Sequence, residues 1–216
     1  MTTTIAAPAL EAHDLHKAYS RHRVLRGADL TVDRGQLVAV VGENGTGKST
    51  LLKTLAGTLP ADRGEIRLTG RLGYCPQDPV LNHNLTVDQH LRYFAAAYHL
   101  PDLTHGHELV ARLGYGQYAN TTAGKLSGGT RQKLNLTLAL LHDPDVLLLD
   151  EPYQGFDWET YLRFWDLVAD LRSRGKAIVV ITHLVFEQDR FDTLADLVDG
   201  RLTPRTTTKA AGHADA

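Results

Sequence analysis

One glycine-rich stretch, GENGTGKST at residues 42–50, restricts what this chain can fold into more than any other. It follows an apolar run at residues 37–41 and precedes the helically spaced residues Leu51, Leu52 and Leu55. The pattern GxxxxGK[ST], placed between a strand and a helix, is typical of a loop that binds phosphate groups. Its glycines let backbone N–H groups surround an anion, and the start of the helix adds the positive end of its dipole. The stretch therefore predicts a nucleoside triphosphate site.

Two side chains of this loop have expected roles toward a triphosphate. Lys48 is placed to reach the β- and γ-phosphates, and the Ser49 hydroxyl is placed to bind Mg²⁺. The alternative, a glycine-rich turn that matches the pattern by chance, is disfavoured because an expected strand and helix flank the loop. The loop residues that we expect around the triphosphate are Gly42, Glu43, Asn44, Gly45, Thr46, Gly47, Lys48, Ser49 and Thr50.

Composition and charge disfavour several classes of protein. Hydrophobic residues make up 43% of the 216 residues, which is enough for a folded core. The formal net charge of -2 provides no basic field, so we expect no nucleic-acid partner. No apolar run approaches the ~18 residues needed to cross a bilayer, and the N-terminus does not resemble a secretory signal. The single cysteine, Cys75, fits a reducing compartment. We therefore expect a cytoplasmic protein.

The spacing of apolar residues predicts strands on both sides of a helical segment. Apolar and polar residues alternate in parts of residues 10–41 and again near 66–74, which indicates short strands. Residues 78–142 show helical spacing instead. After them come expected buried strands at 146–149 and 177–181, a helix at 158–174 and a hairpin at 194–203 that turns at Asp199-Gly200.

Within the helical segment, three helices are expected. Thr86 and Gln89 form a capping-box signal for the first. A weaker helix is expected at about 107–113, and a third begins after residues 127–129 and ends near Asp143.

A second feature of a triphosphate site follows this helical segment. The apolar strand at 146–149 ends in Asp150, whose carboxylate is placed to hold Mg²⁺ directly or through water. Glu151 comes next and is expected to face another direction, because side chains alternate along a strand. A carboxylate there could activate an attacking water if it lies within hydrogen-bond reach. The alternative is a strand that ends at a charged surface pair.

Further short motifs occur along the chain, and in order they resemble the motifs of the ABC (ATP-binding cassette) ATPases. The resemblance covers residues 10–203 and is strong because several motifs occur in the family order. The matching positions are Tyr19, the loop at 42–50, Gln77, LSGGT at 126–130, the strand that ends in Asp150 and Glu151, Asp157 in GFD, and His183 in ITH.

The resemblance implies roles for residues outside the phosphate loop. Tyr19 stacks on adenine, Gln77 senses Mg²⁺ and the γ-phosphate, and His183 contacts the γ-phosphate. Glu151 is the catalytic glutamate, and Asp157 belongs to the D-loop. The implied catalytic residues are Glu151, His183 and Lys48, and the implied metal-binding residues are Ser49, Gln77 and Asp150.

The resemblance also implies a dimer. Ser127, Gly128 and Gly129 open a helix, so that their N–H groups can face the γ-phosphate of an ATP held by another cassette. Two cassettes then lie head to tail with ATP between them. The implied cofactors are ATP and Mg²⁺, and the implied partners are a second cassette, identical or different, and separate transmembrane subunits.

The implied fold is the α/β fold of a P-loop NTPase. It has a RecA-like parallel-sheet core, an antiparallel β subdomain and an inserted α-helical subdomain. A single ABC ATPase domain is expected at 9–203. Its parts are a catalytic core at 10–77 and 143–203, a helical subdomain with the LSGGT motif at 78–142, and flexible tails at 1–8 and 204–216.

The implied function is ATP hydrolysis coupled to transport, at the inner face of the cell membrane. Residues 72–77 and 84–87 are similar to small bacterial exporter cassettes, which favours export. One alternative is a soluble ABC ATPase that acts on a nucleic-acid or protein assembly. A cassette that binds ATP without hydrolysing it is disfavoured because Lys48, Asp150, Glu151 and His183 are all present. A nucleotide kinase is disfavoured because kinases lack an LSGGT-like motif.

The chain departs from the family pattern at three places. Thr130 replaces the usual glutamine, and Tyr153-Gln154 replaces the commoner Thr-Ser. Leu184 follows His183 where an aspartate is usual. None of these changes removes a catalytic group.

Overall fold

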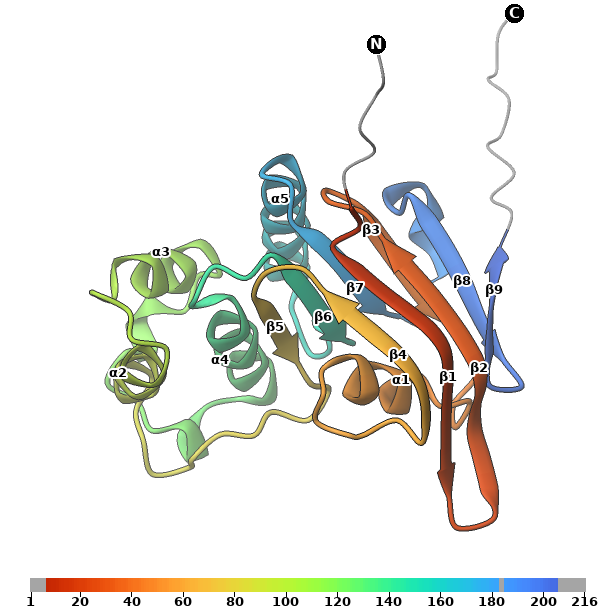
Figure 1. Ribbon diagram of the computed structural model, residues 1–216. Helices are drawn as coiled ribbons and strands as arrows, with labels where there is room; N and C mark the ends of the chain where they lie inside the picture. Colours follow the sequence, from red (N-terminus) through yellow and green to blue (C-terminus); the bar gives the residue numbers. More distant parts are fainter. Residues whose placement is uncertain (1–6, 183–184, 206–216) are drawn as a thin grey trace, which may run out of the picture.

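Two β-sheets and a set of helices build the structure, a computed structural model that describes residues 7–182 and 185–205 (Figure 1). The larger sheet has six strands in the order β5-β6-β7-β3-β8-β9. All neighbours pair in parallel except β8 and β9, which form the hairpin expected from the sequence. The strands are β3 (Leu37–Val41), β5 (Leu72–Cys75), β6 (Val146–Asp150), β7 (Ala177–Ile181), β8 (Thr193–Val198) and β9 (Arg201–Arg205).

A smaller antiparallel sheet lies beside the larger one. Its order is β2-β1-β4, with β1 at Leu10–Tyr19, β2 at His22–Val32 and β4 at Arg63–Leu68. The β1–β2 hairpin is long and extends away from the rest of the molecule in Figure 1. The predicted combination of a parallel core sheet and an antiparallel β subdomain is therefore confirmed.

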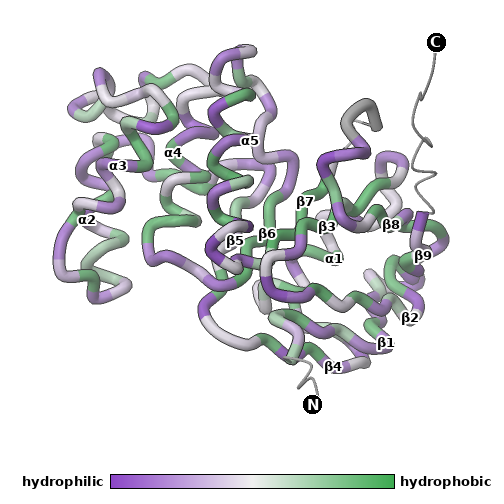
Figure 2. Tube along the Cα trace, turned by 90° about the horizontal axis from the view of Figure 1, so that it is seen from above, coloured by the Kyte–Doolittle hydropathy of each residue, from purple (hydrophilic) through white to green (hydrophobic). Residues whose placement is uncertain are grey.

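The central strands contribute to two separate cores because their side chains alternate between the two faces of the sheet. In β6, Leu147 and Leu149 pack with the helical part of the molecule. Val146 and Leu148 pack on the opposite face, with the antiparallel sheet and with α1 (Lys48–Leu55). Figure 2 shows the apolar stretches concentrated along these central strands. This alternation assigns Asp150, at the end of β6, to the same face as Val146 and Leu148, which is the face that α1 covers.

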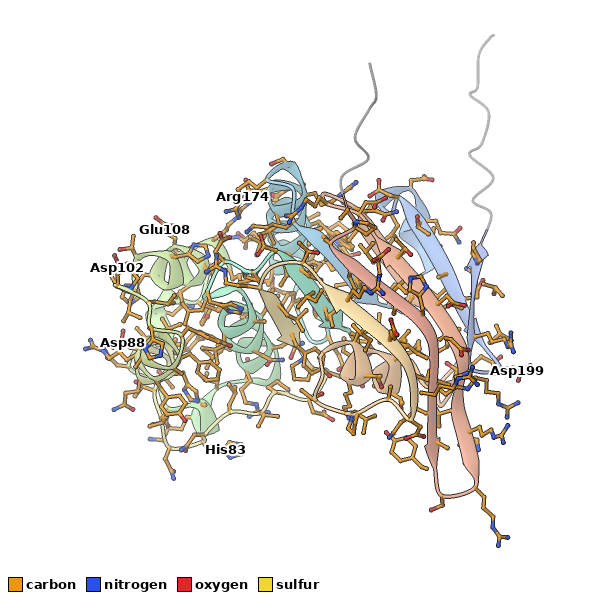
Figure 3. The ribbon with its side chains drawn as sticks, viewed as in Figure 1. His83, Asp88, Asp102, Glu108, Arg174 and Asp199 are labelled. Atoms are coloured by element: carbon orange, nitrogen blue, oxygen red, sulfur yellow. The ribbon has the colours of Figure 1, made fainter. Side chains whose placement is uncertain are left out.

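Three helices form the inserted segment on one side of the sheet: α2 (Val87–Ala97), α3 (Thr104–Arg112) and α4 (Gly128–Leu140). The capping box of Thr86 and Gln89 at the start of α2 is confirmed. Helix α3 begins three residues before the expected position, because the Asp102 side chain accepts the Thr104 N–H at 2.8 Å. The labelled acidic side chains of Asp88, Asp102 and Glu108 lie along the outer side of this segment (Figure 3).

The last α-helix of the described residues, α5 (Trp158–Ser173), follows the motif GFD. The Asp157 side chain caps it by accepting the Thr160 N–H at 2.8 Å. Pro204 and Arg205, which we expected in a flexible C-terminal tail, belong instead to β9. They pair with Ala195 and Leu194 of β8, and the Arg205 guanidinium binds the Asp196 carboxylate at 2.5 and 2.8 Å. Across the described residues, none of the helices is long and apolar enough to span a membrane.

Candidate functional site

A cleft of about 570 Å³ opens where the phosphate loop faces the ends of the central strands. Parallel sheets commonly bind ligands at the carboxyl ends of their strands. The cleft brings together residues that are distant in the sequence: the loop after β3, Gln77 after β5 and Glu151 after β6. Its lining consists of His22, Val24, Asn44, Gly45, Gly47, Lys48, Ser49, Thr50, Gln77, Glu151 and Gln154.

The backbone at Gly47 explains why the loop needs glycine there. Gly47 has φ of 103°, a conformation that residues with a side chain rarely adopt. A Cβ atom at this position would also lie 2.4 Å from Cγ1 of Val24. The loop is therefore held close against β2, and the close approach depends on the absence of a side chain.

Helix α1 begins at this loop without a side-chain cap. Its N-cap residue is Gly47, which provides no side chain to accept the first N–H groups. The first N–H groups of a helix have no partner within the helix, and they need an acceptor. In α5, by contrast, the Asp157 side chain fills this role. An anion in the cleft is therefore the natural acceptor at the start of α1.

Lys48 is almost buried, with 7% of its surface exposed. Its Nζ donates to the carbonyl oxygens of Gly42 and Glu43, both at 2.8 Å, so the side chain folds back along the loop. Burial lowers the pKa of Lys48, and the nearby carboxylates of Glu151 and Asp150 oppose this effect. The lysine thus holds a cationic group at the centre of the loop, where phosphate oxygens could replace the two carbonyls.

Asp150 has the features expected of a metal ligand. It is 2% exposed, and its Oδ1 has no hydrogen-bond partner among the described residues. Burial raises the pKa of Asp150, a hydrogen bond from Ser49 lowers it, and the charge of Glu151 raises it further. A buried carboxylate oxygen without a donor and a neighbouring hydroxyl form the hard oxygen set that suits Mg²⁺. The residues present therefore fit the magnesium site that the sequence predicts at Ser49 and Asp150.

Glu151 lies just beyond β6 rather than within it. Its φ is 47°, and its N–H donates to the Ile181 carbonyl at 3.2 Å. The direction of its side chain thus depends on a turn. It does not follow from the alternation of side chains along a strand that we expected from the sequence. The Gln77 side chain donates to Glu151 Oε2 at 3.1 Å, which joins the two predicted residues directly. Gln77 therefore lies beside the candidate catalytic carboxylate, whereas no bond from it to Ser49 or Asp150 is present.

The expected base-stacking residue, Tyr19, lies at the end of β1 and is 48% exposed. It does not line the cleft, but its partner across the β1–β2 hairpin, His22, does. His22 and Val24 were not among the site residues predicted from the sequence. These two residues line the cleft because the β1–β2 hairpin lies against the phosphate loop. The strand pattern in the sequence could have predicted only that they pair with β1.

Ser127, Gly128 and Gly129 of the LSGGT motif, which we call the signature segment, do not line this cleft. Ser127 is the N-cap of α4, and its Oγ accepts the Thr130 N–H at 3.2 Å and contacts the Thr130 hydroxyl at 2.9 Å. The threonine that replaces the family glutamine thus holds the serine in place. Ser127 and Gly128 are exposed, and a Cβ atom on Gly128 would meet nothing within 4 Å. This end of α4 therefore presents a free surface.

The two residues that replace Thr-Ser have different surroundings. The Tyr153 hydroxyl forms a short hydrogen bond with Thr182 at the end of β7, and its ring packs against Tyr161, Phe164 and Trp165. Gln154 lines the cleft. The predicted His183 and the neighbouring Leu184 lie outside the described residues.

Comparison with known proteins gives a consistent match. Residues 25–154 match the family described as ABC transporter. The chain is 32% identical over 212 residues to Nod factor export ATP-binding protein I of Ralstonia nicotianae, which covers 91% of this chain and 66% of that protein. It is 30% identical over 209 residues to ABC transporter G family member 20 of Dictyostelium discoideum, which covers 90% of this chain and 29% of that protein. The chain thus spans only part of these relatives.

Solved structures support the same fold. The ATP binding subunit of an ABC transporter superposes with a TM-score of 0.85 at 29% identity, over 92% of this chain and 90% of that chain. A dimeric bacterial ABC transporter cassette superposes with a TM-score of 0.81 at 22% identity, over 89% of this chain and 96% of that chain. Because the second structure is only 22% identical, its similarity to this chain shows the fold alone.

Proposed function

The chain belongs to the ABC transporter family, and we propose that it hydrolyses ATP as one half of a cassette dimer that drives export through separate membrane-spanning subunits. The observation that carries this proposal is one cleft that is lined by Lys48, Ser49, Gln77 and Glu151. The buried Asp150 lies close to Ser49 and Glu151. The export direction is supported by the relative from Ralstonia nicotianae, whose name describes export. We place the cassette at the cytoplasmic face of the membrane, where ATP is available. The proposed division is a core at 10–77 and 143–205, extended to the end of β9, with a helical subdomain at 78–142.

Binding begins at the phosphate loop. The N–H groups at the start of α1 and the Lys48 ammonium would take up the β- and γ-phosphate oxygens, since the helix start has no side-chain cap and the ammonium donates to two backbone carbonyls that phosphate oxygens could replace. Ser49 and Asp150, and Gln77 as a further candidate, would hold Mg²⁺, which neutralises charge on the phosphates when bound. The exposed Tyr19 is proposed to stack on adenine. His183 is proposed to contact the γ-phosphate.

Hydrolysis requires a water that is oriented toward the γ-phosphate. Glu151 is the candidate general base, because it lies in the cleft and its carboxylate is held by Gln77 at 3.1 Å. The free surface formed by Ser127 and Gly128 would meet the ATP of a second cassette, with Gly129 beside them. Each cassette then supplies a phosphate loop to one nucleotide and a signature segment to the other.

The test is the Glu151→Gln variant, which keeps the size and hydrogen-bonding capacity of the side chain and removes its basicity. Purified wild-type protein should hydrolyse Mg-ATP, and the variant should lose activity by roughly a hundredfold or more, as expected for a general base. The variant should still bind ATP and should form an ATP-dependent dimer in gel filtration. Equal turnover of the two proteins would reject Glu151 as the base. Co-purification with ribosomes or nucleic acid, in place of a membrane protein, would reject the transport role.

A further inference from the structure

Helix α4 carries buried polar side chains that the proposed mechanism does not use. Gln132 and Asn135 are 3% and 7% exposed, and they lie among buried leucines of the same helix. Polar groups in such a position destabilise a fold unless they find hydrogen-bond partners. The two shortest hydrogen bonds of Asn135 leave its own helix: its Nδ2 donates to the Pro76 carbonyl at 2.7 Å and to Cys75 Sγ at 3.2 Å, and a longer one goes to Gln132 Oε1 on α4 at 3.4 Å.

The Asn135–Pro76 hydrogen bond acts next to the cleft. Pro76 directly precedes Gln77, whose side chain donates to Glu151. Proline has no backbone N–H, so its carbonyl is the only hydrogen-bonding group it offers. The Asn135 side chain therefore holds Pro76, the residue before Gln77, through the only hydrogen-bonding group that Pro76 has. Two hydrogen bonds and one peptide unit join α4 to the candidate base.

The same helix also contacts the segment on the other side of Glu151. Gly129 lies so close to Gly155 that a Cβ atom on it would be 2.3 Å from the Gly155 carbonyl oxygen. One turn further along, Lys133 Nζ lies 4.0 Å from an Asp157 oxygen. Helix α4 thus contacts the segment that precedes Gln77 and also the segment that follows Glu151. Asn135 hydrogen-bonds to the first of these segments.

We propose that Asn135 is a positioning residue for catalysis, which holds Pro76 and thereby keeps Gln77 on the Glu151 carboxylate. The inference rests on the proposed role of Glu151. It adds a connection within one chain. The first residues of α4 face the ATP of a second cassette, and the same helix is linked to the general base Glu151 of its own chain. A movement of α4 that follows contact with that ATP is passed to Glu151 through the Asn135–Pro76 and Gln77–Glu151 hydrogen bonds.

The first test compares Asn135→Leu with a matched control. The leucine removes the donor and keeps a similar size. We expect the kcat for ATP hydrolysis to fall roughly tenfold, as for the loss of one buried hydrogen bond, while the Kd for ATP stays unchanged. The control is Thr137→Val on the same helix. Thr137 is fully buried and bonds to Tyr115 and to the Lys133 carbonyl, away from Pro76 and Gln77. It should lower the Tm and leave kcat unchanged.

A double-mutant cycle separates positioning from a general loss of stability. If Asn135 acts through Gln77, Asn135→Leu should cost nothing more in kcat once Gln77→Ala is present. Losses that multiply in the double variant would overturn the inference. If Asn135→Leu does not fold, Asn135→Asp carries the same comparison, because it keeps the shape and replaces the donor by an acceptor.

Cys75 provides a readout that does not depend on activity. It is the only cysteine of the chain, it is fully buried, and burial raises the pKa of its thiol, so alkylation of the folded wild-type protein should be slow. Asn135→Leu should raise the alkylation rate severalfold, and Thr137→Val should not. A folded Asn135→Leu protein with wild-type kcat and alkylation rate would overturn the inference and leave the proposed function intact. An inactive wild-type protein would instead reject the proposed function, and the alkylation rates would still test the Asn135–Pro76 contact.

Discussion

The starts of α1 and α4 are two glycine-containing helix ends with opposite surroundings. The start of α1 has no side-chain cap and opens on a cleft that contains Lys48, Gln77 and Glu151. The start of α4 is capped by Ser127, is exposed to solvent and borders no part of that cleft. The first end thus holds a nearly complete set of groups for a triphosphate. The second end can offer N–H groups to a ligand, but none of the candidate catalytic residues that the structure describes lies beside it.

This difference supports the proposal that one chain contains two unlike halves of a site. The glycines at the two ends also serve different needs. Gly47 allows a positive φ and close contact with Val24 inside its own chain. Gly128 has open space around its missing side chain, which is what a group from another molecule would require. The functional unit is therefore expected to be two cassettes, each completing the other.

Removal of the cation from the first end should have the largest effect. Lys48→Ala removes the ammonium group from the loop and should lower ATP hydrolysis by about 10²–10³-fold, as for other groups that stabilise transition-state charge. Binding of ATP to the isolated chain should weaken as well. The check is a steady-state ATPase assay together with fluorescence titration by a labelled nucleotide. Near-normal hydrolysis would mean that the cleft is not the site of the reaction.

A change at the second end should separate hydrolysis from binding. Ser127→Arg places a long side chain on the exposed start of α4, and it should reduce hydrolysis by roughly tenfold to a hundredfold because the arginine displaces the N–H groups of this helix start from the ATP of a second cassette. The Kd of the isolated chain for ATP should stay unchanged, in contrast to Lys48→Ala. Equal weakening of binding by the two variants would show that both ends serve the same nucleotide in one chain.

The smallest effect is expected for the base-stacking residue. Tyr19→Ala should raise the Kd for ATP by about threefold to tenfold, which corresponds to the ~0.5–1.5 kcal/mol of one aromatic stacking contact. Tyr19→Phe is the control and should bind as the wild type does. Titrations with ATP and with inorganic triphosphate distinguish the explanations, since only ATP has a base to lose. If triphosphate binding weakened equally, Tyr19 would act on the loop and not on adenine.

The sequence predicted the phosphate loop well because its geometry is local. Residues 42–50 are contiguous, and the glycine and lysine positions specify one backbone path between a strand and a helix. The position of Asp150 followed similarly from an apolar strand. The side-chain direction of Glu151 did not, because it depends on a turn with φ of 47° after β6.

Contacts between distant segments were beyond sequence reasoning. The bond from Asn135 to Pro76 joins residues 59 positions apart and depends on how α4 packs against the end of β5. The same holds for His22 and Val24, which line the cleft only because the β1–β2 hairpin lies against the loop. The extension of β9 to Arg205 likewise depends on an ion pair with Asp196 across the hairpin.

The central claim is that the phosphate loop of one cassette works with the signature segment of another, and mixing two inactive variants tests it most directly. Alone, the Lys48→Ala and Ser127→Arg proteins should each show only the residual ATPase rates given above, a tenth of the wild-type rate or less. In a mixed dimer, the intact loop of the Ser127→Arg chain meets the intact signature segment of the Lys48→Ala chain. An equal mixture should therefore recover about a quarter of the wild-type ATPase rate, since half of randomly formed dimers are mixed and each has one intact site. A mixture as inactive as its two components would contradict the account.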